Sequence, residues 1–313
     1  MRPFARIIAA IVALGLTAFG LAACNNGSSS NLSPPPRQRL FVANFASGAA
    51  SSNVSMYAFP LTNSSVASTV LGSGGGPNGA SGIAIDPFDD LFVANASNNT
   101  VTAYVPIVGT TSVPAVTITH GMSEPQDVTL DARNVFYVAE FTGSGTGNVS
   151  VYAPPLSSAS SPQFAVTSGI SGPTSVAFDG VASIYVTNKT AATVTRYAVP
   201  ASASSTPTLT LSNGLSTPAA AVVDASGNVY VANTGNSSIV VFTGTLSNSS
   251  SPTFSITNGI NAPRYLIFDA AGRLYVSNAS AITIYQPPFS ASSAPVVTIT
   301  SGLSTPIGLS IGF

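Results

Sequence analysis

The 313-residue sequence has no tryptophan, one histidine and one cysteine, and only 6% of its residues are charged. The absence of tryptophan removes the usual aromatic platform on which proteins stack sugars. A single cysteine excludes a disulfide bond within the chain. A single histidine supports neither a Ser-His-Asp triad nor a zinc site with several histidine ligands. Nine basic against ten acidic side chains, with no basic stripe, argue against a nucleic-acid partner.

Long apolar runs are also missing beyond the N-terminus, where no run approaches the ~18 residues that a membrane helix needs. Residues 1–23 combine Arg2 and Arg6 with an apolar stretch and small residues, which is typical of a secretory signal peptide. The segment Leu21-Ala22-Ala23-Cys24 resembles a bacterial lipobox, in which Cys24 becomes the lipid-modified first residue of the mature protein. The alternative is an ordinary cleaved signal peptide with an incidental cysteine.

Residues 24–39 comprise that cysteine and a Ser- and Pro-rich segment. Such a segment buries too little apolar surface to fold alone, so we expect a disordered tether. The lipid at Cys24 would hold the protein on a membrane of the bacterial cell envelope, the outer membrane in a Gram-negative source, with the domain outside the cytoplasm. We expect residues 40–313 to form one monomeric domain that binds an unidentified protein or small molecule.

The domain is organised by a short apolar box that occurs six times, at intervals of 45 to 51 residues. This period is typical of propeller blades. Each box is rich in β-branched and aromatic residues and is bounded by turn formers, which predicts a strand. The boxes are Leu40 to Asn44, Leu91 to Asn95, Phe136 to Glu140, Ile184 to Asn188, Val229 to Asn233 and Leu274 to Asn278.

Each repeat reads as four strands, with the box second and a tyrosine-ended strand third in most copies. An aspartate ends the first strand of five repeats, and we interpret it as a turn former. The chain enters at a second strand and finishes on residues 306–311, which read as a first strand. The sequence therefore predicts an all-β, six-bladed β-propeller with four antiparallel strands per blade, closed by the C-terminal strand in blade one.

The boxes Tyr275-Val276-Ser277-Asn278 and Tyr185-Val186-Thr187-Asn188, each followed by a Thr/Val-rich strand, resemble NHL and YVTN-type propeller repeats. The resemblance covers residues 40–313. It implies the fold, and it leaves the activity open, because that superfamily includes binding scaffolds, lactonases of the gluconolactonase and paraoxonase kind, and lyases.

Ligands of propellers generally bind around the central channel, on the face that receives the box-ending residues. We expect these residues to cap the turns that follow them, or alternatively to contact a ligand. One repeat departs from the others, because four titratable residues fall on this face within it, and Lys189 and Arg264 add two cations to the same rim. The candidate face comprises Asn44, Asn95, Glu140, Asn188, Asn233, Asn278, Glu124, Asp127, His120 and Arg264.

A carboxylate cluster with amide oxygens nearby suits a hard cation such as Ca²⁺. The resemblance implies that gluconolactonase-type propellers hold a divalent ion in the channel, and only Glu140 and Asp127 are analogues of its ligands here. The alternative is that these acids and His120 are solvated loop residues. We favour a non-catalytic binding or scaffolding propeller with no cofactor. The alternatives are a divalent-metal-dependent hydrolase of the lactonase type that uses Glu140 and Asp127, and a purely structural surface protein.

Overall fold

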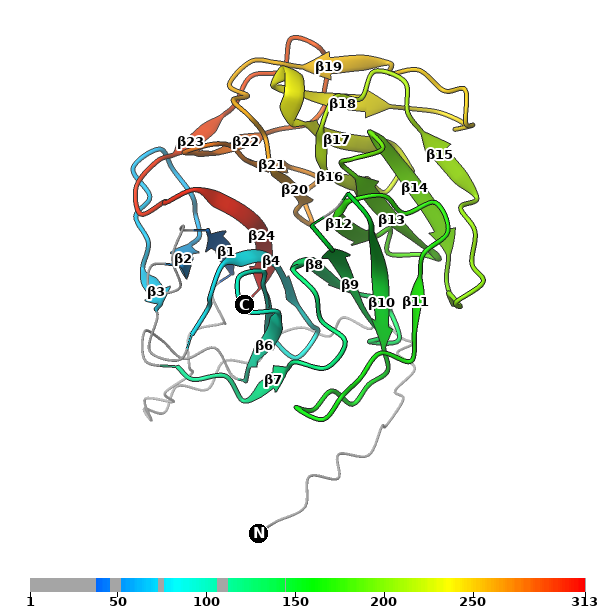
Figure 1. The fold of residues 1–313 in the computed structure, drawn as a ribbon. Helices are drawn as coiled ribbons and strands as arrows, with labels where there is room; N and C mark the ends of the chain where they lie inside the picture. The colour runs from blue at the N-terminus through cyan, green and yellow to red at the C-terminus, as the bar shows by residue number, and fades with distance from the viewer. Residues whose placement is uncertain (1–37, 46–51, 73–75, 106–111, 144, 313) are drawn as a thin grey trace, which may run out of the picture. The chain divides into compact units, whose positions relative to one another are not determined.

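Each of the six boxes forms the second strand of a four-stranded antiparallel sheet in a computed structural model of the protein. The structure describes residues 38–45, 52–72, 76–105, 112–143 and 145–312, so Cys24 and nearly all of the expected tether lie outside the described residues. The sheets follow one another around a central axis (Figure 1). Within the described ranges there is no helix of a length and apolarity that would cross a membrane.

The strands occupy equivalent places in each blade. The first strands, in blade order, are β24 (Pro306–Gly312), β4 (Ala80–Ile85), β8 (Pro125–Leu130), β12 (Pro173–Phe178), β16 (Pro218–Val223) and β20 (Tyr265–Phe268). The second strands are β1 (Arg39–Asn44), β5 (Leu91–Asn95), β9 (Phe136–Phe141), β13 (Ser183–Asn188), β17 (Val229–Asn233) and β21 (Leu274–Ser277). The third are β2 (Asn53–Ala58), β6 (Thr100–Tyr104), β10 (Gly147–Tyr152), β14 (Thr193–Ala198), β18 (Ser238–Phe242) and β22 (Ile282–Tyr285). The fourth are β3 (Thr69–Leu71), β7 (Val116–Ile118), β11 (Phe164–Val166), β15 (Leu209–Leu211), β19 (Phe254–Ile256) and β23 (Val297–Ile299), and a single 3-10 turn, η1 (Thr234–Asn236), follows β17.

The second strands are buried on both faces, which explains their continuous apolar sequence. Every residue of β5 and of β17 is buried, because each strand is packed between two neighbouring blades. Buried tyrosines at the end of the third strands tie four of the blades to loops through hydroxyl-to-carbonyl hydrogen bonds. The hydroxyl of Tyr197, for example, donates a hydrogen bond to the carbonyl oxygen of Ser168 at 2.6 Å.

The aspartates at the ends of the first strands form turns, as the sequence predicts. Asp224 Oδ1 accepts hydrogen bonds from the backbone N–H groups of Ser226 and Asn228, both at 2.9 Å. The same arrangement recurs at Asp86, Asp131, Asp179 and Asp269. These five carboxylates therefore belong to the hairpins between first and second strands, at the end of the propeller opposite the box-ending residues.

The C-terminal strand closes the ring, and this confirms the predicted topology. β24 pairs antiparallel with β1, with Leu40 opposite Ile311 and Val42 opposite Leu309. In Figure 1 the red C-terminal strand lies beside the blue N-terminal strand within one blade. β24 is also the strand of blade one that contacts β4 and β20 of the two neighbouring blades.

Deleting residues 306–313 should lower the free energy of unfolding far more than the loss of a loose terminus would, because the deletion removes a first strand and exposes the apolar edges of its neighbours. We expect a loss of several kcal/mol, seen as a fall in Tm of roughly 10 °C or more in a thermal melt followed by circular dichroism. A synthetic peptide of residues 306–313 added in excess should recover part of that loss. A truncated protein that melts within a degree or two of the intact one would contradict the closure.

Candidate functional site

The asparagines that end the second strands brace the loops between blades. Asn188 is fully buried, its Oδ1 accepts the N–H of Ser171 at 3.0 Å, and its Nδ2 donates to Thr195 Oγ1 at 3.0 Å. Equivalent oxygens accept a loop N–H at Asn44, Asn95, Asn233 and Asn278. The loop that each asparagine holds precedes the first strand of its own blade, so it is not the following turn that the sequence led us to expect. The ring of asparagines is architectural.

Glu140 occupies the sixth place of this ring, and its carboxyl group accepts the N–H of the loop before the first strand, as the asparagines do. Its side chain is only 3% exposed, and it accepts hydrogen bonds from the N–H of Ser123 and from the side chains of Ser150 and Asn148. Burial raises the pKa of Glu140 to about 7, while these hydrogen bonds lower it. A protonated carboxyl has one accepting and one donating oxygen, which is the pattern of the asparagine amide in the other blades.

Replacing Glu140 with Gln should therefore make stability less dependent on pH. The folded-state pKa lies above the unfolded value, so the stability linked to this group is complete below about pH 4 and is lost as the pH rises through about 7. We expect Glu140→Gln to match wild type near pH 4.5 and to exceed it by about 1–3 kcal/mol at pH 8 in urea unfolding. Asn95→Asp places a second carboxyl group at the equivalent buried position of a neighbouring blade. It should therefore make the unfolding free energy fall more steeply as the pH rises. If the unfolding free energies of wild type and Glu140→Gln depend on pH in the same way, Glu140 does not have a raised pKa in the folded protein.

The second residue of the first strand lines the mouth of the central channel in five blades, and in the sixth the equivalent residue, Arg264, directly precedes β20. The backbone register shifts at this point in most blades, as between Pro125 and Asp127, and such bulges re-aim a side chain. The six positions are Ile307, Ser81, Gln126, Thr174, Ala219 and Arg264, and all of them line one cavity of about 390 Å³. Lys189, Thr217 and Thr234 complete its polar wall.

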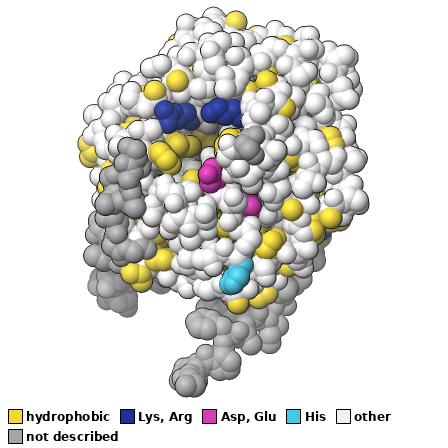
Figure 2. Space-filling view, viewed as in Figure 1, with side chains coloured by type: hydrophobic (Ala, Val, Ile, Leu, Met, Phe, Trp, Pro, Cys, Tyr) yellow, Lys and Arg dark blue, Asp and Glu magenta, His cyan; other side chains and the backbone are white. Residues whose placement is uncertain are grey.

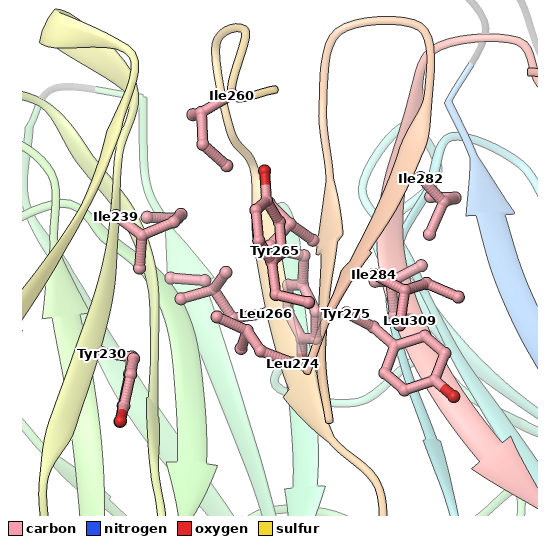
Figure 3. Close-up of a cluster of buried hydrophobic side chains, with 14 of the residues drawn as sticks. Tyr230, Ile239, Ile260, Tyr265, Leu266, Leu274, Tyr275, Ile282, Ile284 and Leu309 are labelled. Carbon is pink, nitrogen blue, oxygen red and sulfur yellow. The ribbon is translucent and has the colours of Figure 1, made fainter. Parts of the chain in front are cut away.

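Asp127 and Tyr265 meet one residue deeper, across the channel. The Tyr265 hydroxyl lies 2.9 and 3.0 Å from the two oxygens of Asp127, which is fully buried on β8, while Tyr265 begins β20. Asp127 also accepts the N–H groups of Val128, at 2.9 Å, and Val176, at 3.0 Å. Figure 3 shows the tyrosine rising from the hydrophobic cluster, with its hydroxyl toward the end of the sheet at which Ile260 lies.

The other blades leave room for this pair, because their corresponding residues are small. These are Gly308, Gly82, Ser175 and Ala220. A Cβ atom on Gly82 would lie 2.2 Å from Asp127 Oδ1, so no larger residue fits there. Tyr265 lines the cavity at the mouth and also a second cavity of about 390 Å³ on the other side, whose wall includes Ile83, Val128 and Leu309. The phenol ring thus lies between the mouth cavity, which Arg264 and Lys189 also line, and the lower cavity.

Burial dominates the electrostatics of the pair. It raises the pKa of Asp127 to about 7, although the hydrogen bonds from Tyr265, Val176, Ser175 and Val128 oppose the shift. The pKa of Tyr265 is raised well above its ordinary value by burial and by the charge of Asp127. Near neutral pH, Tyr265 is therefore a hydrogen-bond donor and Asp127 is a carboxyl group that gains or loses a proton easily.

The other titratable residues of the candidate face lie elsewhere. His120 is exposed, and its carbonyl oxygen accepts the hydroxyl of Tyr152 at 2.9 Å. Glu124 is exposed, its N–H donates to Asn99 Oδ1 at 2.7 Å, and it lines a different hollow with Asn99 and Phe45. Of the four titratable residues of the repeat that departs from the others, only Asp127 faces the channel.

This donor set does not fit a divalent cation. No group of three or more His, Cys, Asp or Glu side chains within the described ranges could hold a metal ion. The oxygens of Asp127 face N–H and O–H donors, and Glu140 accepts an N–H inside its blade. A calcium site needs several oxygen atoms turned toward one point. The predicted calcium ligands are therefore not brought together, and calcium binding itself stays a prediction.

Comparisons with known proteins bear on the fold and its family. The family model of the NHL repeat matches residues 215–242, which contain the first three strands of blade five. The chain is an NHL-type six-bladed β-propeller. No curated protein sequence matches it.

Solved structures similar to this NHL-type propeller include two that carry the name of an activity. A periplasmic gluconolactonase from Pseudomonas aeruginosa has a TM-score of 0.63 and 15% identity, covering 88% of this chain and 99% of that one. A Bacteroides fragilis protein provisionally assigned as a 6-phosphogluconolactonase has a TM-score of 0.63 and 13% identity, covering 92% and 100%. A Lactobacillus plantarum protein with no named activity has a TM-score of 0.62 and 15% identity, covering 88% and 100%.

These likenesses correct one prediction from the sequence. We favoured a non-catalytic binding or scaffolding propeller, and the similar structures that carry a name for an activity support the lactonase alternative instead. We favoured a scaffold because a lone histidine and unrecognisable metal-ligand spacing left no catalytic group. In the propeller each blade contributes one residue to the channel mouth, among them Arg264, which the sequence placed on this face, and Gln126, which it did not single out. Tyr265, beside Arg264, was also not singled out.

Proposed function

We propose that this NHL-type propeller is a hydrolase of the lactonase type that acts at the channel mouth. One observation carries the proposal: the mouth cavity, which Arg264 lines, is also lined by a phenol, Tyr265, that is hydrogen-bonded to a buried carboxyl group, Asp127, whose pKa is about 7. A group with that pKa exchanges protons efficiently at neutral pH. The names of the two similar lactonases support the choice of reaction.

The geometry suits water attack on an acyl carbon. A water molecule bound to the Tyr265 oxygen would give its proton to that oxygen, while the phenolic proton passes to Asp127. The new C–O bond forms as the carbonyl oxygen becomes an anion, which the neighbouring Arg264 would stabilise. Collapse of the intermediate breaks the ring C–O bond, and the proton returns along the same path to the leaving alkoxide. Because the predicted metal ligands face hydrogen-bond donors, no step is assigned to a metal ion.

We also propose that the protein works at the cell envelope, anchored by a lipid on Cys24. The N-terminal sequence supports this placement through its charged start, its apolar stretch and its lipobox-like residues 21–24. One similar lactonase is named as periplasmic, which agrees with a domain outside the cytoplasm.

Hydrolysis of aldonolactones by the purified protein, followed by acid release in a pH-stat, tests the proposal. We expect kcat/KM to rise about tenfold per pH unit below about 7 and to level above it, because Asp127 must be ionised to accept a proton. Tyr265→Phe should lower kcat by roughly 100-fold or more, since proton transfer contributes about 10²–10⁴-fold. A chelator should leave the rate unchanged.

Tyr275→Phe is the matched control, because it removes the same atom from the same blade. Its hydroxyl donates to Asp269 Oδ2 at 3.0 Å in the hairpin at the opposite end, so turnover should stay at the wild-type level. The proposal is wrong if a well-folded wild-type protein hydrolyses no lactone, or if both Tyr→Phe variants behave alike.

A further inference from the structure

Two cations line the cavity at the channel mouth without an acidic partner. The ion pairs within the described ranges are Arg133 with Asp131 and Arg273 with Asp269, both in hairpins at the opposite end. Arg264 is partly buried at the mouth, and desolvation lowers its pKa with no carboxylate to oppose the shift. A charge withdrawn from water without a counter-charge is costly unless a ligand supplies one.

Figure 2 shows this face, which carries the only histidine of the chain. The blue Lys and Arg side chains visible there lie near each other beside yellow apolar surface, and magenta Asp and Glu side chains lie between them and the histidine. Lys189 and Arg264 both line the mouth cavity. This end of the channel is therefore positively charged at its wall.

The hydroxyl groups of Ser81, Thr174 and Thr234 each donate their hydrogen to a backbone carbonyl oxygen. Ser81 Oγ donates to the carbonyl oxygen of Pro125 at 2.9 Å, and Thr174 Oγ1 donates to that of Ala219 at 2.8 Å. Thr234 Oγ1 likewise donates to a backbone carbonyl, and Gln126 Nε2 donates to that of Glu124 at 2.9 Å. The three hydroxyl oxygens and Oε1 of Gln126 still offer acceptor lone pairs to a ligand, and Gln126 Nε2 keeps one further N–H.

We propose that the mouth cavity binds a polyhydroxylated anion, whose carboxylate or phosphate group lies between Arg264 and Lys189 and whose hydroxyl groups donate to Ser81, Thr174 and Gln126. The two cations would form charge-assisted hydrogen bonds with the anionic group, and the oxygen acceptors of the cavity wall would accept hydrogen bonds from the hydroxyl groups of the ligand. A ligand without charge would leave the cations unmatched, and a bare inorganic anion would leave the acceptors unmatched. This inference deepens the proposed function and rests on it only for placing the site at the channel mouth.

Isothermal titration calorimetry with three probes of similar size tests it: gluconate, glucose 6-phosphate and the neutral polyol glucitol. We expect at least one of the two anions to bind at least tenfold more tightly than glucitol at low salt, and raising NaCl from 50 to 500 mM to weaken it several-fold. The comparison of the two anions identifies whether a carboxylate or a phosphate is preferred.

Arg264→Gln and Lys189→Met should each weaken anion binding, Arg264→Gln by tenfold or more, and leave any glucitol binding unchanged. Arg196→Gln is the matched control, because Arg196 lies on β14 and its Nε donates to Thr208 Oγ1 away from the cavity. Its anion affinity should equal that of wild type. Thermal melts of all variants check that the fold is retained.

Failure of this inference and failure of the proposed function are separable. Anion binding that depends on Arg264, in a protein that turns over no lactone, supports the inference and removes the proposed function. Lactone turnover with equal affinity for gluconate, glucose 6-phosphate and glucitol, or with no effect of Arg264→Gln on anion binding, overturns the inference and leaves the hydrolase standing. Absence of binding for all three probes also overturns it.

Discussion

A single carboxylate at the centre of the ring, that of Asp127, constrains the rest of the channel. Its hydrogen bonds come from three blades: from Val128 in its own strand, from Val176 in the next blade and from Tyr265 across the channel. A buried carboxyl group is costly unless donors surround it. The contact is possible only because the facing positions are small, with Gly82 directly against the carboxylate.

The same contact gives the two ends of the channel different chemistry. Below Tyr265 the wall includes the side chains of Ile83 and Leu309, whereas above it the wall carries Arg264, Lys189 and hydroxyl oxygens. Convergent polar groups over an apolar floor are typical of small-molecule sites. The hairpin aspartates gather at the opposite end of the propeller, so they do not compete for Arg264 and Lys189 at the mouth.

The repeating parts of the fold could be predicted from the sequence because local rules determine them. The apolar boxes, the turn aspartates such as Asp224 and the closure by β24 each follow from a pattern that recurs at a fixed period. The central pair could not be predicted in this way, because Asp127 and Tyr265 are 138 residues apart and meet only when opposite blades face each other. Glu140 was singled out as a candidate ligand because it replaces the asparagine of the other blades, and its burial and hydrogen bonds fit a part in the architecture of its blade.

A double-mutant cycle on the central pair tests this account most directly. Unfolding free energies of wild type, Asp127→Asn, Tyr265→Phe and the double variant should be measured in urea at pH 7.5, where Asp127 is mostly ionised. Groups in direct contact at a buried site couple by about 0.5–3 kcal/mol, and we expect a coupling in the upper half of that range. Additive effects, within about 0.3–0.5 kcal/mol, would contradict the contact across the channel on which the proposed site depends.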